Sequence, residues 1–271
     1  MAFPLFRSDT NGLASGNVIE EAILHALFEV IERDALSVAD QKRDLGRRLV
    51  IGKECAAREV LDRFEENGID IHLWLLEGKT GVPPTVAAAA DDTVTKDPAM
   101  LVIGSGTHLS PPEIAALRAL TEVAQSRGSY LQGGRNDPPQ REMIIRKAGY
   151  ERLKRINRMW FDDADAVDIA DVPPDASTRR FDTDIRQVLE EVAPPHTDRV
   201  CVCDLSRTAV PVVRVVVPGF EVSYMDPDRK RPVQGANLPP GFSPEIPAPP
   251  PPRRDRREGG NTEGASCKAL Q

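Results

Sequence analysis

The first long hydrophobic segment of the chain, residues 17–34, has the 3.6-residue periodicity of an α-helix, and its apolar residues continue to about residue 39. Its sequence is NVIEEAILHALFEVIERD, and its polar side chains occupy about one third of the helical wheel: Asn17, Glu21, His25, Glu29 and Glu32. The rest of the circumference is almost entirely apolar, which is typical of a largely buried helix. Carboxylates on a buried helix require cations or hydrogen-bond donors opposite them. The pattern therefore indicates a functional site on this helix.

The remaining hydrophobic pattern predicts a mixed α/β (α+β) fold in which helices pack against mixed sheets. We expect further helices at four places: residues 53–67, 111–127, 141–161 and 183–192. We expect strands at five places: residues 69–77, 82–90, 100–106, 199–205 and 210–221. The acidic, proline-containing residues 162–177 predict an exposed loop.

The composition changes near residue 225, where proline, glycine and charged residues begin to dominate. Such a composition lacks the apolar side chains needed to build a core. We therefore expect one folded domain over residues 1–224, followed by an extended or disordered tail over residues 225–271.

Bulk composition excludes several classes of protein. The chain has 271 residues, of which 40% are hydrophobic and 28% charged, as in ordinary soluble domains. Its net charge of −7 gives no support for nucleic-acid binding. No signal peptide and no membrane-spanning apolar run are visible, so we expect a cytoplasmic protein without a membrane partner. The four scattered cysteines predict neither a disulfide framework nor a zinc ribbon.

The polar face of the first helix has the chemistry of a metal-nucleotide site. Glu21, Glu29 and Glu32 offer hard oxygen ligands of the kind that Mg²⁺ takes while it also binds phosphates. Asn17 could add an amide group, and Arg33 could pair with a carboxylate or a phosphate. The alternative is a solvated helix face, where most glutamates of globular proteins lie.

A second predicted helix carries a similar polar stripe. Within residues 111–127, four polar side chains share a narrow face: Arg118, Thr121, Glu122 and Gln125. An ordinary amphipathic helix explains this face equally well, but two such helices favour polar faces that oppose each other.

The GKT at residues 78–80 is not a P-loop, because Leu73 replaces the required glycine. The GSG at residues 104–106 is typical of a strand end, with phosphate binding as the alternative.

Three separated segments together resemble the YcaO family. They are TNGLASGN…EEAILHALFEVIERDAL, then GSGTHLSPPEIAALRALTEVAQSR followed by GGRNDP, and finally VVRVVVPGFE. The resemblance runs from about Asn11 to Glu221 and is greatest to the subgroup that works with a TfuA partner.

This resemblance implies an ATP-dependent enzyme that phosphorylates the oxygen of a peptide backbone amide, after which a nucleophile displaces the phosphate. In TfuA-linked members the nucleophile is a sulfur donor and the product is a thioamide. The cofactors implied are ATP and Mg²⁺. The partners implied are a peptide or protein substrate and a TfuA-like protein, and a second copy of the chain in a homodimer is a further candidate.

The resemblance also implies site residues, carried over by position. Five match the family's nucleotide and magnesium motif: Asn17, Glu21, Glu29, Glu32 and Arg33, of which the three glutamates would hold the metal. Arg135, in GGRND, matches a further family arginine. No catalytic residue is assigned.

The chain departs from the family pattern in lacking a match to its N-terminal half, which contributes a lysine, a serine and further glutamates. We therefore expect an N-terminally truncated YcaO domain. Two alternatives to thioamide formation follow: a truncated remnant without catalysis, or a cyclodehydratase that forms azolines. The proline-rich residues 244–252 resemble the PxPxP terminus of azoline-forming members, but they are followed by further residues.

Overall fold

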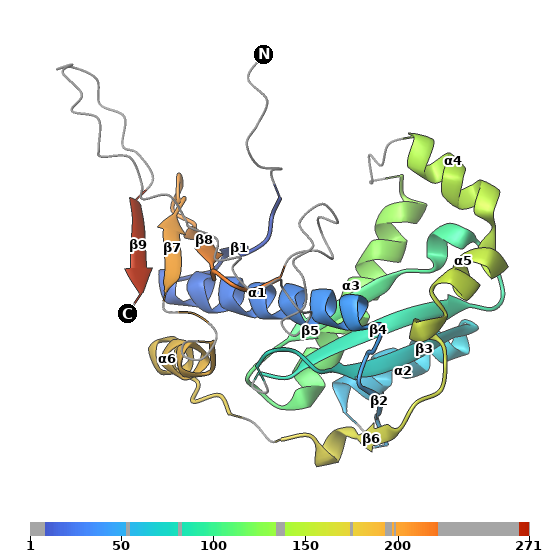
Figure 1. The fold of residues 1–271 in the computed structure, drawn as a ribbon, viewed down its shortest axis with the longest axis horizontal. Coiled ribbons are helices and arrows are strands. Elements are labelled where there is room, and N and C mark those ends of the chain that lie inside the picture. The colour runs from blue at the N-terminus through green and yellow to red at the C-terminus, as the bar shows by residue number, and fades with distance from the viewer. Residues whose placement is uncertain are drawn as a thin grey trace, which may run out of the picture.

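The structure is a computed structural model. It describes residues 9–52, 55–80, 83–133, 139–173, 176–192, 197, 199–221 and 266–270, with only the backbone at 139–141 and 266–270. Two β-sheets lie along one long helix, α1 (Figure 1). The mixed α/β class predicted from the sequence is confirmed.

Helix α1, Ile19–Lys42, connects the two halves of the fold. Its first half packs against the four-stranded sheet through a cluster that includes Leu27 and Phe28. Its second half packs against the five-stranded sheet through Ala35 and Leu36. The helix extends beyond the predicted end because its apolar face remains buried as far as Ala39. It ends at Arg43, whose left-handed backbone (φ 57°) lets its amide bond back to the last turn.

The four-stranded sheet is antiparallel throughout, in the order β1-β8-β7-β9. Its strands are β1 (Leu13–Ser15), β8 (Val212–Val216), β7 (Val200–Asp204) and β9 (Ser266–Leu270). Strand β9 lies within the segment 225–271, for which an extended or disordered tail was expected; it pairs with β7 and places Cys203 opposite Cys267. Cys203 is disulfide-bonded.

The five-stranded sheet has the order β5-β4-β3-β2-β6, and only the β2–β6 pair is parallel. Its strands are β5 (Ile103–Thr107), β4 (Thr85–Asp92), β3 (Ile69–Leu76), β2 (Arg47–Val50) and β6 (Ala166–Asp168). Helices α2 (Ala56–Glu66) and α3 (Pro112–Leu131) cover one face, and α1 packs on the other. Strand β4 is therefore buried at every position.

The other helices are α4 (Pro139–Ala148), α5 (Tyr150–Ile156) and α6 (Phe181–Val192), with 3₁₀ turns η1 (Pro98–Met100), η2 (Arg158–Trp160) and η3 (Ile169–Asp171). The helical segment predicted for residues 141–161 is divided into α4, α5 and η2; Gly149 adopts φ 77° and separates α4 from α5. The predicted loop at 162–177 contains β6 and η3. Strands β1 and β2 were missed, since one has three residues and the other begins with two arginines.

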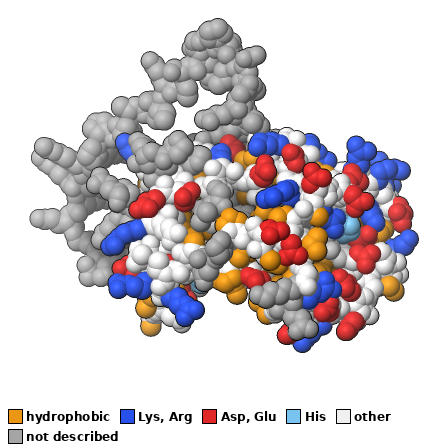
Figure 2. All heavy atoms as spheres, turned by 90° about the horizontal axis from the view of Figure 1, so that it is seen from below, with side chains coloured by type: hydrophobic (Ala, Val, Ile, Leu, Met, Phe, Trp, Pro, Cys, Tyr) orange, Lys and Arg blue, Asp and Glu red, His pale blue; other side chains and the backbone are white. Residues whose placement is uncertain are grey.

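On the face shown in Figure 2, basic and acidic side chains are interspersed, with hydrophobic side chains exposed between them. Among the residues that the structure describes, no helix is both long and apolar enough to cross a membrane.

Candidate functional site

The close approach of α3 to strand β5 builds one wall of the site. A Cβ atom at Gly104 would lie 2.3 Å from the carbonyl oxygen of Ala119, and one at Gly106 would lie 2.4 Å from that of Ala115. Only glycine fits at these two positions. Because side chains alternate along a strand, Ser105 points to the opposite face, toward α1. The two glycines of the GSG sequence thus allow β5 and α3 to pack closely against each other.

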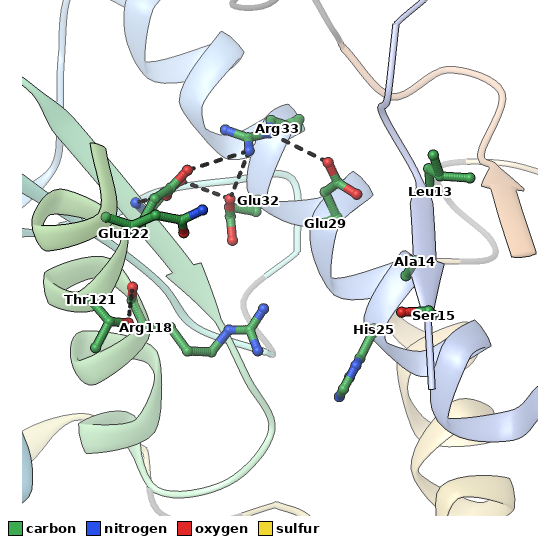
Figure 3. Close-up of a pocket in the computed structure, with 12 residues that line it drawn as sticks. Leu13, Ala14, Ser15, His25, Glu29, Glu32, Arg33, Arg118, Thr121 and Glu122 are labelled. Carbon is green, nitrogen blue, oxygen red and sulfur yellow. Dashed lines mark hydrogen bonds and ion pairs between the residues drawn. The ribbon is translucent and has the colours of Figure 1, made fainter. Parts of the chain in front are cut away.

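The polar faces of α1 and α3 oppose each other across a cavity of about 520 Å³. Figure 3 shows Glu29, Glu32 and Arg33 reaching into it from α1, and Arg118 and Glu122 from α3. The remaining lining residues are Leu13, Ala14, Ser15, His25, Ser105, Thr121 and Gln125. The opposed polar faces predicted for the two helices are confirmed.

The guanidinium of Arg33 lies among three carboxylates (Figure 3). Its Nη2 atom is 3.6 Å from Oε1 of Glu32 and 3.8 Å from Oε1 of Glu122, and its Nε atom is 4.0 Å from Oε1 of Glu29. These distances are ion pairs rather than hydrogen bonds. Within the described part of the chain, the buried Nε atom has no hydrogen-bond partner. A buried donor without an acceptor is costly, so this atom is suited to a ligand oxygen.

The carboxylates of Glu32 and Glu122 are joined through Ser105. The Ser105 hydroxyl donates to Oε1 of Glu32 at 2.7 Å and lies 3.2 Å from Oε2 of Glu122. The Ser105 backbone N–H donates to the same Glu122 oxygen at 2.6 Å. One strand residue therefore contacts acidic side chains from two helices.

Burial makes these carboxylates hard to ionise without a ligand. Desolvation, aided by the neighbouring charges of Glu32 and Glu122, raises the pKa of Glu29 to about 7, although Arg33 opposes this shift. Desolvation also raises the pKa of Glu32, which is 5% exposed. Added positive charge in the cavity would favour the ionised forms of both.

His25 lies on the same face of α1, one turn before Glu29 (Figure 3). Burial lowers its pKa, and the positive charge of Arg118 lowers it further. The imidazole is therefore neutral near pH 7 and can accept or donate a hydrogen bond within the cavity.

The structure brings together three of the six site residues predicted from the sequence, namely Glu29, Glu32 and Arg33. Glu21 lies two turns of α1 before Glu29, where its carboxylate accepts from the backbone N–H of Asn17 at 2.6 Å and from its side chain at 2.9 Å. These two residues are not among those lining the cavity, and the Asn17 bonds lower the pKa of Glu21. Arg135 lies outside the described residues.

Sequence reasoning did not assign Ser105, Glu122 or Arg118 to the site. The signal for Glu122 and Arg118 was the polar stripe of their helix, which an ordinary surface helix would also have. The signal for Ser105 was a hydroxyl between two glycines in a buried strand. Neither pattern specifies which side chains meet in the fold. Ser105 contacts Glu122, 17 residues away in the sequence, and Glu32, 73 residues away.

Among the described residues, no group of three or more His, Cys, Asp or Glu side chains is already arranged to hold a metal ion. Mg²⁺ is commonly held by one or two carboxylates together with phosphate oxygens, and it needs no complete protein cage. The separated carboxylates of Glu29, Glu32 and Glu122 and the unbonded Nε of Arg33 therefore fit a magnesium–nucleotide complex better than a metal ion alone.

Known proteins similar to the chain agree with this chemistry. Residues 1–221 match the family model for the YcaO cyclodehydratase, described as binding ATP and Mg²⁺. The chain is 48% identical, over 83% of its length, to an uncharacterized protein of Methanothermobacter thermautotrophicus, of which it covers 59%. It is 29% identical, over 81% of its length, to a Rhizobium leguminosarum protein encoded in the tfuA 3′ region, of which it covers 54%.

Among solved structures, the chain resembles YcaO from Methanopyrus kandleri bound with AMPPCP and Mg²⁺. The TM-score is 0.73 and the identity 31%, over 86% of this chain and 62% of that one. The chain thus spans between half and two thirds of the length of these relatives. The family model covers most of the chain, and the fold agrees with a solved member, so the chain belongs to the YcaO family.

Proposed function

We propose that this chain forms part of an ATP-dependent enzyme that activates a peptide backbone amide, and that the product is a thioamide made with a TfuA-type partner. The observation that carries the proposal is the cluster of three carboxylates around Arg33, supplied by two helices that face each other across a cavity. Support comes from the family's description as ATP- and Mg²⁺-binding.

The cluster has a charge distribution that a magnesium–nucleotide complex would complement. Three carboxylates face the cavity with the two guanidinium groups of Arg33 and Arg118. The raised pKa of Glu29, about 7, reports the cost of ionising it without a ligand. A divalent cation would remove this cost, and phosphate oxygens would fill the remaining coordination positions of the cation.

Each residue has a distinct proposed role. Glu29 and Glu32 would hold Mg²⁺, and Glu21 would add a further carboxylate at the amino-terminal end of α1, where Asn17 orients it. The unbonded Nε of Arg33 would donate to a phosphate oxygen. Arg135 would contribute to the same nucleotide site.

Bound ATP would supply the phosphoryl group that turns a poor leaving group, the amide oxygen, into a good one. The contribution of this chain is to position the phosphates and to concentrate positive charge near them. Such positioning in a half-buried cavity strengthens each electrostatic contact relative to water.

Thioamide formation is favoured over azoline formation by the relative encoded beside tfuA. The two reactions differ in the nucleophile, which is a sulfur donor in the first and a Cys, Ser or Thr side chain of the substrate in the second. The experiment is mass spectrometry of a candidate peptide incubated with the protein, a TfuA-type partner, MgATP and a sulfide source. Exchange of oxygen for sulfur supports the proposal, whereas loss of water indicates azoline formation.

The nucleotide site itself is tested by calorimetry. We expect Mg²⁺-dependent binding of ATP by the wild type, and a loss of at least about tenfold in affinity for Glu29→Gln and Glu32→Gln. Glu65→Gln, on the exposed face of α2, is the matched control and should bind as the wild type does. An absence of binding by the wild-type chain would overturn the proposal and favour a non-catalytic role.

A further inference from the structure

We propose that Ser105 is the positioning residue that fixes the carboxylates of Glu32 and Glu122 for cation binding. The inference rests on the magnesium–nucleotide function proposed above and adds to it a residue that acts through the two carboxylates. It is drawn from the bonds that Ser105 makes to α1 and α3.

Ser105 supplies two donors to two carboxylates. Its hydroxyl carries a single proton, which the short 2.7 Å contact directs to Glu32. The longer 3.2 Å contact between this hydroxyl and Glu122 therefore adds little. The carboxylate of Glu122 instead accepts a hydrogen bond from the backbone N–H of Ser105 at 2.6 Å. Each acidic side chain thus has its own donor from the same residue.

The position of Ser105 on an edge strand explains why its backbone N–H is free to bind a side chain. Among the strands that the structure describes, β5 is the terminal one of its sheet and pairs with β4 alone. An edge strand presents unpaired N–H groups on its outer side. Glu122 accepts one of these N–H groups, which it can reach because Gly104 and Gly106 let α3 lie close against the strand.

The hydroxyl matters most for Glu32. This carboxylate is buried, and the guanidinium of Arg33 lies at ion-pair distance, 3.6 Å away. Removal of the hydroxyl would leave the carboxylate without its short hydrogen bond and free to turn toward the guanidinium. Partners that orient a metal ligand in this way typically contribute a factor of about 10–100 to metal affinity.

The test separates orientation of the carboxylates from general folding. Calorimetry at a fixed ATP concentration gives the Mg²⁺ concentration for half-maximal nucleotide binding in the wild type, Ser105→Ala and Ser105→Thr. We expect that concentration to rise at least about tenfold in Ser105→Ala. Ser105→Thr, which retains a hydroxyl, should recover most of the loss. Nucleotide affinity at saturating Mg²⁺ should change much less.

Thr107→Val is the matched control. Thr107 lies two residues further along the same strand, is fully buried, and shares its hydroxyl hydrogen bond with Thr85 at 2.7 Å. The Thr107→Val substitution removes a buried hydroxyl–hydroxyl hydrogen bond but no contact to a site carboxylate. The Mg²⁺ concentration for half-maximal nucleotide binding should therefore stay that of the wild type. Thermal unfolding of all variants reports on folding separately.

Three results would overturn the inference. The first is a Ser105→Ala protein with the wild-type Mg²⁺ requirement, which leaves the nucleotide function intact. The second is an equal shift in Thr107→Val, which would reveal a general effect of the strand. The third is a wild-type protein that binds no MgATP; this result alone removes the proposed function, and the inference with it.

Discussion

The carboxylate of Asp34 accepts a hydrogen bond from Nζ of Lys79 at 2.8 Å and one from the backbone N–H of Glu221 at 2.7 Å. The same ammonium group donates to the carbonyl of Gly219 at 2.7 Å. Asp34 is 1% exposed, so this buried junction joins α1 to the loop after β3, which carries Lys79, and to the segment after β8, which carries Gly219 and Glu221. Neighbouring residues of α1 therefore have different roles. Glu29, Glu32 and Arg33 face the cavity, whereas Asp34 stabilises the fold.

Asp34→Ala should destabilise the protein by about 2–4 kcal/mol, because it removes the acceptor of a buried N–H and the counter-ion of a part-buried ammonium, which keeps only the carbonyl of Gly219. Urea denaturation measures the loss. Glu151→Ala is the control, since the ion pair between Glu151 and Lys96 is exposed and should contribute no more than about 1 kcal/mol. Equal losses in the two variants would contradict the structural role of the junction.

Gly106→Ala should move α3 away from β5. The added Cβ would lie 2.4 Å from a backbone oxygen and 2.6 Å from Cβ of Arg118, and neither can yield without a shift of the helix. We expect a loss of about 1–3 kcal/mol in stability, together with weaker MgATP binding, since Glu122 moves with the helix.

The control for this substitution lies on the same helix. A Cβ at Gly128 would meet nothing within 4 Å, so Gly128→Ala should stabilise the protein by about 0.5–1 kcal/mol through helix propensity. MgATP binding by Gly128→Ala should match the wild type. Unchanged MgATP binding in a folded Gly106→Ala protein would show that the spacing of α3 and β5 does not set the site.

The sequence was sufficient for features that depend on local periodicity. Helix α1, with its apolar circumference and polar stripe, could be predicted because burial and charge lie on one element. The pairings that complete the site could not be predicted in this way. Ser105 meets Glu32 across 73 residues, and Asp34 meets Glu221 across 187. Such contacts are fixed by packing of whole elements, which no short-range pattern encodes.

The short strands were missed for a related reason. A three-residue strand such as β1 has too few residues to show an alternating pattern, and its existence depends on β8 beside it. Strand β2 begins with Arg47 and Arg48, and it is a strand because β3 and β6 flank it. Tertiary context overrode local preference in both.

Arg33→Lys should weaken MgATP binding by about tenfold or more although the charge is retained. The guanidinium presents several donors in a fixed plane to three carboxylates and leaves Nε for a ligand, whereas an ammonium is a single point charge. Arg43→Lys is the control, because Arg43 ends α1 and pairs with the surface residue Asp40 at 3.4 Å. Calorimetry measures the MgATP affinity of both variants. Equal affinities of Arg33→Lys and Arg43→Lys would exclude a phosphate contact through Nε of Arg33.

The raised pKa of Glu29 makes the stability of the ligand-free protein fall as pH rises. Its carboxyl titrates near 7 when folded, against 4.5 for the unfolded reference, so the folded state binds the proton more tightly between these values. The stabilising effect of this proton is complete below pH 4.5 and is lost as pH rises through 7. A difference of this size corresponds to at most about 3 kcal/mol.

Glu29→Gln tests this directly, because the amide imitates the protonated carboxyl at every pH. We expect wild type and variant to be nearly equal in stability at low pH, and the variant to be more stable by about 1–3 kcal/mol above neutrality. Urea denaturation across this pH range measures the difference. MgATP should reverse the order at high pH by stabilising the wild type more than the variant, since the ionised carboxylate is the form that holds the cation. A constant difference across the range would show that the pKa of Glu29 is the same in the folded and unfolded states and that its burial carries no cost.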